Sequence, residues 1–355
     1  MNPADYSALD ETLEIMAPMG PDLNNGFSNH APMAIEALCA MGRSDAVMPW
    51  FERYRSGLAP RPARIARLID DNWRAALGDV RRTEDWFEFF RNELEERPWP
   101  AVLDTWAARL TPGLMAAATH GVIRTGHATR ALALEDTPAR RRELADGLAY
   151  WAADYMPLPA ARRTPARARP SDAIARVQMI PADSRRGNFG SLTDALARLD
   201  FFPPFKDTLD AVDPTGDARA FISDLTATFA RVFLANAHDT YTTIAFVHAV
   251  TGPSAIRPLL PFLRDTTARA ALAYAWQAAA AMYATFGTKA DLAHIDKDQL
   301  KVCDEDELVE RAIACGDEHA IKFTEVCLRE HASNPDPAFF AAPGHAIHML
   351  SRAGS

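Results

Sequence analysis

Apolar residues recur at three- and four-residue steps along most of the chain, which is the spacing of one face of an α-helix. Alternating β-branched residues, the pattern of a half-buried strand, are almost absent. The pattern therefore predicts an all-α fold and a single helical domain over residues 1–355. The predicted helices cover residues 33–41, 46–55, 65–77, 83–97, 100–111, 114–134, 138–154, 191–199, 218–234, 242–250, 254–261, 264–286, 305–315 and 319–332.

Two segments interrupt this helical pattern. Residues 156–170 are rich in proline and arginine and cannot form a regular helix, because proline removes a backbone donor and clashes with the preceding turn. We interpret this segment as a solvated connector between two helical halves. The alternative is that its arginines bind an anionic substrate or RNA. Residues 334–355 contain three prolines and predict a loosely packed end.

Composition narrows the class of protein. The formal net charge of -9 argues against nucleic acid and acidic membranes as partners, since both require a basic field. The N-terminal residues lack the basic flank and apolar centre of a signal peptide. Residues 270–286, the apolar part of the longest uncharged run, are shorter than the roughly 20 apolar residues of a membrane span. The four cysteines have no CxxC spacing. We therefore expect a cytoplasmic protein with reduced thiols.

Histidine is the residue type with the strongest chemical implication. An imidazole is costly to bury without a partner, and a neutral imidazole is the commonest metal ligand in proteins. For each histidine alone, a hydrogen-bonded structural role is the simpler interpretation, so only convergence of several would indicate a metal. Six of the ten histidines lie in short apolar or helix-like segments: His30, His120, His127, His238, His248 and His319.

Spacing along a helix limits which of these histidines share an ion. His238 and His248 are ten residues apart, about 15 Å along a helix, and His120 and His127 are separated by about 10 Å. Each of these two pairs therefore contributes at most one ligand. With His30 and His319, the filter leaves four histidines, one from each region.

Lys322 accompanies the last of these regions. It lies three residues after His319 and faces the same point of a helix. The alternative for Lys322 is an ion pair with Glu318, four residues earlier, worth about 0.2 to 0.5 kcal/mol. The alternative for His30 is a helix cap, because Asn29 or Ser28 followed by Pro32 is typical of a helix start.

The segments around these histidines resemble the questin oxidase-like family, whose members are associated with oxidative opening of aromatic polyketide rings. The resemblance lies in SNHAPMAIEAL at residues 28–38, HGVIR at 120–124, HAVTG at 248–252 and DEHAIKFTE at 317–325. It implies an all-α fold and a metal-dependent oxygenase that cleaves a small aromatic substrate by a Baeyer–Villiger-type or dioxygenase reaction. Molecular oxygen is the implied co-substrate, and NADPH is a further candidate.

The resemblance also implies a set of ligands for a non-haem iron (Fe²⁺). These are His30, His120, His248, His319 and a carboxylated Lys322. Residue type alone does not identify the ion, because imidazole suits iron, copper, zinc and nickel. His127 and His238 lie outside the matching positions and are candidates to contact the ligands.

The remaining chemistry follows from what an oxygenase needs. Molecular oxygen reacts slowly with organic molecules unless a metal, flavin or radical takes part, and the chain shows no GxGxxG after a strand. Arg124, one turn after His120, is with Lys322 a candidate catalytic residue that binds a phenolate or carboxylate, or else it pairs with an acidic neighbour. Candidate walls of a substrate pocket, or alternatively core residues, are Phe27, Phe246, Trp276 and Tyr283.

Two other functions stay open at this point. The adjacent His238 and Asp239 are compatible with an HD-type metal-dependent phosphohydrolase, although a further histidine pair and a distant aspartate are not identified. A non-enzymatic helical interaction protein, whose histidines are all structural, is the third hypothesis. The oligomeric state does not follow from the sequence.

Overall fold

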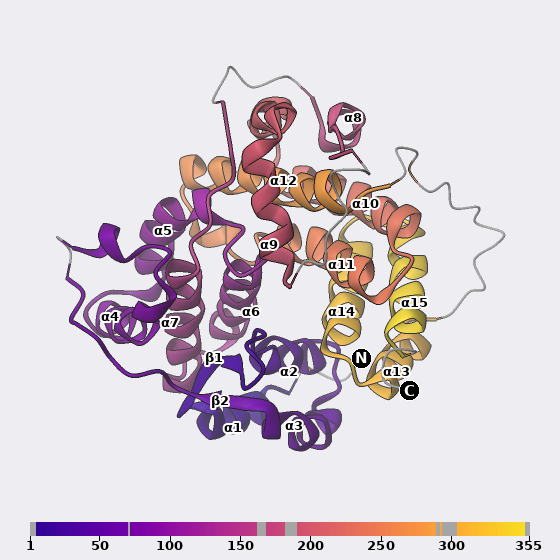
Figure 1. Ribbon diagram of the computed structural model, residues 1–355. Helices are drawn as coiled ribbons and strands as arrows, with labels where there is room; N and C mark the ends of the chain where they lie inside the picture. Colours follow the sequence, from indigo (N-terminus) through magenta and orange to yellow (C-terminus); the bar gives the residue numbers. More distant parts are fainter. Residues whose placement is uncertain are drawn as a thin grey trace. The chain divides into compact units, whose positions relative to one another are not determined.

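A computed structural model describes residues 5–69, 72–161, 168–181, 190–288, 292 and 304–351 of the chain. Over these residues the secondary structure is helical apart from two short strands, so the predicted all-α class is confirmed (Figure 1). The chain divides into two compact units, which are described separately. The first unit comprises Met1–Pro157 and Pro258–Thr267, and the second comprises Leu158–Arg257 and Ala268–Ser355. The single domain predicted for residues 1–355 stays a prediction.

The first unit contains seven α-helices among its described residues and a two-stranded antiparallel sheet. The strands are β1 (Met19–Leu23) and β2 (Leu58–Pro60). The helices are α1 (Ser7–Met16), α2 (Ala31–Ala40), α3 (Val47–Tyr54), α4 (Thr83–Glu96), α5 (Trp99–Leu110), α6 (His120–Leu134) and α7 (Pro138–Ala153). Helix α7 packs against both α4 and α6, and α6 packs against α2.

Two glycines allow α6 and α7 to approach each other closely. A Cβ atom added to Gly121 of α6 would lie 2.6 Å from the Cα atom of Trp151 and 3.0 Å from its backbone nitrogen. A Cβ atom on Gly147 of α7 would lie 3.0 Å from the backbone nitrogen of Thr125. The atoms that these Cβ atoms would meet belong to the backbone and cannot rotate away as a side chain can. Only glycine therefore fits at the two positions. His120, the first residue of α6, directly precedes Gly121 at this crossing of α6 and α7.

The second unit is built mainly from longer helices. Its helices are α8 (Pro170–Ala173), α9 (Leu192–Leu196), α10 (Ala218–Asn236), α11 (Thr240–Ser254), α13 (Glu305–Cys315), α14 (Glu318–Ser333) and α15 (Ala338–Ser351). Helix α12 (Asp265–Phe286) begins in the segment assigned to the first unit and continues in the second. Helix α10 packs against α11 and α15, and α14 packs against α11, α13 and α15.

Helix caps fix where α11 and α14 begin. The Asp239 carboxylate accepts from the backbone nitrogen of Thr242 at 2.7 Å, and the two residues form a capping box. The Asp317 carboxylate accepts from the backbone nitrogen of His319 at 2.8 Å. Each cap satisfies a backbone donor that the helix itself leaves unpaired. The starts of α11 and α14, which carry His248 and His319, are therefore set by local aspartates.

Three sequence predictions are wrong. The described residues of the range 65–77, which leave out 70 and 71, do not form an α-helix, because the Asp85 carboxylate accepts from the backbone nitrogens of Ile65 and Ala66, and Ile65 and Ile69 are exposed. Ser254 is the last residue of α11, and residues 255–261 form turns and part of a short 3-10 helix, which agrees with Pro258 and Pro261 breaking the ladder. Within the range 334–355, residues 338–351 form helix α15, with buried Phe339, Ala346 and Leu350, and are not loosely packed.

Two further expectations concern the connector and membranes. Residues 162–167 of the proposed connector 156–170 lie outside the described residues. The remainder of that segment, up to the start of α8, contains no α-helix. Over the described residues, every helix falls short of the length and apolar character that a membrane crossing requires.

Candidate functional site

In the first unit, His30 and His120 bring ring nitrogens to one point. His30 directly precedes α2, and His120 is the first residue of α6. The two Nε2 atoms are 2.5 Å apart, and the ring centroids are separated by 4.5 Å. The Nδ1 atom of His120 lies 2.5 Å from the Ala117 carbonyl oxygen, which assigns the ring proton to Nδ1 and a lone pair to Nε2. Two imidazole nitrogens that converge in this way have the chemistry of a metal-binding pair.

The turn before His120 has an unusual backbone. Ala117, Ala118 and Thr119 have φ angles of 46°, 53° and 75°, so three consecutive non-glycine residues adopt the left-handed region. This conformation costs roughly 1–2 kcal/mol per residue, and such strain clusters at functional sites. It directs the Ala117 carbonyl oxygen at the ring of His120 and so fixes the tautomer of that ring.

In the second unit, His248 of α11 and His319 of α14 form another pair. Their ring centroids are 5.4 Å apart, with an interplanar angle of 70°. The Nδ1 atom of His248 donates to the Ile244 carbonyl oxygen at 2.7 Å, and the Nδ1 atom of His319 lies 3.2 Å from the Asp317 carboxylate. Both contacts favour the proton on Nδ1 and leave the lone pair of Nε2 as the ligand atom. The donor set of this pair therefore also suits a metal ion.

Lys322 lies one turn after His319 on α14 and is buried, with 1% of its surface exposed. Burial lowers its pKa to about 8, although the charges of Glu318 and Asp317 act in the opposite direction. A solvent-exposed ion pair with Glu318, the alternative that the sequence left open, requires an exposed lysine. The lysine is instead enclosed, and burial lowers the free energy needed to remove its proton.

Arg124 of α6 is paired with acidic neighbours. Its Nε and Nη2 atoms donate to the two carboxylate oxygens of Glu143 at 2.6 and 2.8 Å, and Nη2 lies 3.5 Å from Asp146. All three side chains are buried. Pairing with an acidic neighbour is the second of the two roles that the sequence left open for Arg124. A direct contact with substrate stays a prediction.

The other two histidines selected from the sequence, His127 and His238, differ from each other. His127 of α6 is buried, and its Nδ1 atom lies 2.6 Å from the carboxylate of Glu36 on α2. The side chain of His238 is 58% exposed, and its Nδ1 atom donates to the Asn236 carbonyl oxygen at 2.6 Å. Sequence analysis did not select Glu36. The signal was present, because Glu36 is the one charged residue in the apolar helix APMAIEALCA.

Of the four aromatic residues considered as pocket walls, three are core residues. Phe246, Trp276 and Tyr283 are buried, and the Trp276 ring nitrogen donates to the Thr208 carbonyl oxygen at 2.8 Å. Phe27, in contrast, is 59% exposed. The core alternative therefore describes the first three, and a contact of any of the four with substrate stays a prediction.

A partly buried hydrogen-bonded chain joins three polar side chains, Asp22, Ser28 and Tyr150, of which Tyr150 is buried. The Ser28 and Tyr150 hydroxyls are 2.7 Å apart, and the Tyr150 hydroxyl donates to Asp22 at 3.4 Å. Burial raises the pKa of Asp154 to about 7, and the nearby Asp22 carboxylate adds to this effect. Burial likewise raises the pKa of Asp22 itself. The carboxyl groups of Asp22 and Asp154 therefore keep their protons to higher pH than exposed aspartates do.

Replacing Asp154 by asparagine is expected to stabilise the protein at about pH 8 and to leave it unchanged at about pH 4. Because folding raises the pKa of Asp154, the stability it contributes is complete below its unfolded pKa of about 3.9 and is lost as the pH rises through about 7. Urea midpoints of Asp154→Asn and wild-type protein should thus diverge with rising pH. In Asp136→Asn, which removes an exposed carboxylate of lowered pKa, the difference should have the opposite sign. Parallel curves for Asp154→Asn and wild type would contradict this prediction.

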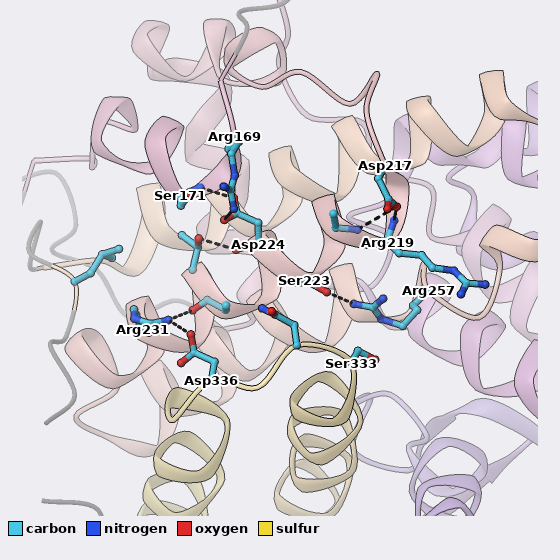
Figure 2. A pocket seen from close by; sticks show the side chains of 15 residues that line it. Arg169, Ser171, Asp217, Arg219, Ser223, Asp224, Arg231, Arg257, Ser333 and Asp336 are labelled. Carbon is cyan, nitrogen blue, oxygen red and sulfur yellow. Dashed lines mark hydrogen bonds and ion pairs between the residues drawn. The ribbon is translucent and has the colours of Figure 1, made fainter. Parts of the chain in front are cut away.

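The second unit also contains a polar groove with a volume of about 890 Å³ (Figure 2). Arginines and aspartates line it, and several are already paired: Arg169 with Asp224 at 2.6 Å and Arg231 with Asp336 at 2.8 Å. Ser333 at its edge follows His319 by fourteen residues on α14, about 21 Å along the helix. We therefore regard the groove as separate from the histidine pair of this unit.

Comparison with protein families matches residues 27–327 to the family described as questin oxidase-like. The matched range contains His30, His120, His248, His319 and Lys322. Among proteins with curated annotation, none matches the chain.

Proposed function

The chain belongs to the questin oxidase-like family, and from this premise we propose that it is an oxygenase that cleaves the ring of an aromatic polyketide-like substrate. Family membership supports an oxygenase-type oxidoreductase. The Baeyer–Villiger-type or dioxygenase reaction, the aromatic substrate and molecular oxygen as co-substrate are the proposed details, with NADPH as a candidate reductant. The observation that carries the proposal is the histidine pair in each unit, because an oxygenase without a flavin site needs a metal.

We propose that His30, His120, His248 and His319 hold one non-haem iron, together with a carboxylated Lys322. The support comes from each unit by itself: two Nε2 atoms converge in the first, and two Nδ1-bonded imidazoles lie side by side in the second. The bound metal would supply the activation of oxygen. The carbonyl and carboxylate partners of the Nδ1 atoms hold the rings in the tautomer that a metal needs.

The other residues have supporting roles in this proposal. Arg124, held by Glu143, keeps a positive charge beside His120 on α6, where it can attract a phenolate. The buried position of Lys322 favours its neutral amine, which reacts with carbon dioxide to form a carbamate. The product is an anionic oxygen ligand, which suits a higher oxidation state of iron.

Replacing Lys322 by alanine is expected to remove metal and activity, because the anionic ligand is lost. A short carboxylic acid such as acetate should restore part of both by occupying the space of the missing side chain. In wild-type protein grown with ¹³C-labelled bicarbonate, a carbamate carbon should be visible by NMR. Lys206→Ala, which removes an exposed lysine of the second unit, is the matched control and should behave as wild type. A Lys322→Ala variant with full metal and activity would refute the carboxylated ligand.

The reaction itself is tested by incubating metal-loaded protein with aromatic polyketide candidates under labelled oxygen. The expected result is oxygen uptake and a ring-opened product that carries the label, identified by mass spectrometry. Release of phosphate from phosphoesters would instead support the HD-type hydrolase. The structure favours this alternative less, because Asp239 caps α11 and its neighbour His238 is exposed. Protein that binds no metal and shows neither activity would support the third hypothesis, a non-enzymatic helical interaction protein.

A further inference from the structure

The contacts of Glu36 connect three elements of the first unit. Its carboxylate accepts from the Tyr6 hydroxyl at 2.9 Å, from Nδ1 of His127 at 2.6 Å and from Nε of Arg130 at 2.7 Å. Tyr6 directly precedes α1, and His127 and Arg130 belong to α6. Glu36 is 1% exposed. Burial by itself raises the pKa of Glu36, but Arg130 and His127 outweigh burial and hold the pKa well below its ordinary value. The group is therefore a buried, ionised and fully hydrogen-bonded carboxylate.

The placement of these contacts matches the placement of the histidine pair. Glu36 follows His30 by six residues, and His127 follows His120 by seven, so both intervals are about two helical turns. Helices α2 and α6 are thus connected twice, at His30 with His120 and two turns later at Glu36 with His127 and Arg130. Moving one helix along the other by a single residue, about 1.5 Å, would disturb both connections.

Apolar contacts alone do not set this register. The other buried residues of α2 are small or aliphatic, such as Ala34, Ala37 and Leu38, and hydrophobic burial is non-directional. Hydrogen bonds from a charged and planar guanidinium are directional and strong. A buried charge that loses its partner is strongly destabilising. Alternative registers that separate Glu36 from Arg130 are therefore disfavoured. The directional information in the α2–α6 contact therefore resides in Glu36 and its partners.

We propose that Glu36 is a positioning residue that sets α2 against α6 and thereby holds His30 and His120 in metal-binding geometry. This inference rests on the proposed metal site, and it adds a residue that is not itself a ligand. Partners of metal ligands typically change metal affinity by 10- to 100-fold when they are replaced. For Glu36, which acts through the helices, we expect a loss of about tenfold.

The test compares metal affinity in competition with a chelator for wild type, Glu36→Gln and Asp85→Asn. Asp85 is the matched control, because it is a buried carboxylate of the first unit on α4 that binds backbone nitrogens and Arg82. Glu36→Gln should bind Fe²⁺ about tenfold more weakly, and Asp85→Asn should stay within about twofold of wild type. Equal losses in the two variants would overturn the proposal, because they would indicate a general effect of stability. Unchanged affinity in Glu36→Gln would overturn it as well.

A second readout does not depend on metal. In metal-free protein labelled with ¹⁵N-histidine, the ring nitrogens of His30 and His120 should shift in Glu36→Gln and keep their positions in Asp85→Asn. If Glu36→Gln does not fold, Arg130→Lys replaces it, since lysine keeps the charge but not the two-nitrogen contact. Ring signals that do not move in the folded variant would refute the positioning role. Wild-type protein that binds no metal would refute the proposed function, while the metal-free spectra would still decide the role of Glu36.

Discussion

Replacing His30, His120, His248 or His319 by alanine is expected to reduce the metal content of the purified protein from about one equivalent to almost none. Each imidazole contributes one of the five ligands of the proposed ion, and the four that remain in a variant hold iron more weakly. Elemental analysis of the four single variants measures this directly. His238→Ala is the control, because its side chain is 58% exposed and bonds to the Asn236 carbonyl oxygen.

The stoichiometry of these variants distinguishes one shared ion from two. If the four histidines share a single ion, each single variant loses all of the metal. If each pair holds its own ion, wild type carries about two equivalents and each variant loses half. Full metal in His248→Ala together with loss in His238→Ala would show that the wrong histidine was chosen in that region.

The second large effect is expected for Gly121→Ala, which should lower the free energy of unfolding by about 3 kcal/mol. The new Cβ atom would meet backbone atoms of Trp151 at 2.6 and 3.0 Å, and α6 and α7 would have to separate. Urea denaturation of wild type and variant measures the change.

Gly57→Ala provides the control for this substitution. Its Cβ atom would lie 3.8 Å from Cδ2 of Leu23, an ordinary contact with a side chain that can move. We expect a change within about 0.5 kcal/mol at this position. A Gly121→Ala variant as stable as Gly57→Ala would contradict the close crossing of α6 and α7.

Much of the helical fold follows from the sequence because apolar periodicity reports directly on burial. Residues 305–315 were predicted and observed as a helix with the same bounds, and α7 and α14 differ by a residue or less at most ends. The failures have local causes. Residues 65–77 have a helical period, but the Asp85 carboxylate, 19 to 20 positions further along the chain, binds the backbone at Ile65 and Ala66 instead. Helix α15 was missed because Pro343 lies inside it.

The candidate site was predictable in its residue types and only partly in its geometry. Spacing selects one histidine from each region, and the sequence motifs of the family select His120 and His248 within their regions. Two features could not be anticipated. The left-handed turn before His120 contains two alanines and a threonine and lacks the glycine that usually indicates such a turn in a sequence. The partners of Glu36 come from α6 and from the start of the chain, and single-sequence periodicity carries no information about such distant contacts.

The positions of His30 and His120 at helix starts have an electrostatic consequence. The N-terminus of a helix carries roughly half a positive charge, and here the beginnings of α2 and α6 meet at one pair of rings. Two positive helix ends disfavour a bare cation and attract an anion. The charge that complements this corner of the first unit is therefore negative. An anionic companion of the metal, such as an ionised phenol of the substrate, would offset the two helix ends, whereas a neutral substrate would not.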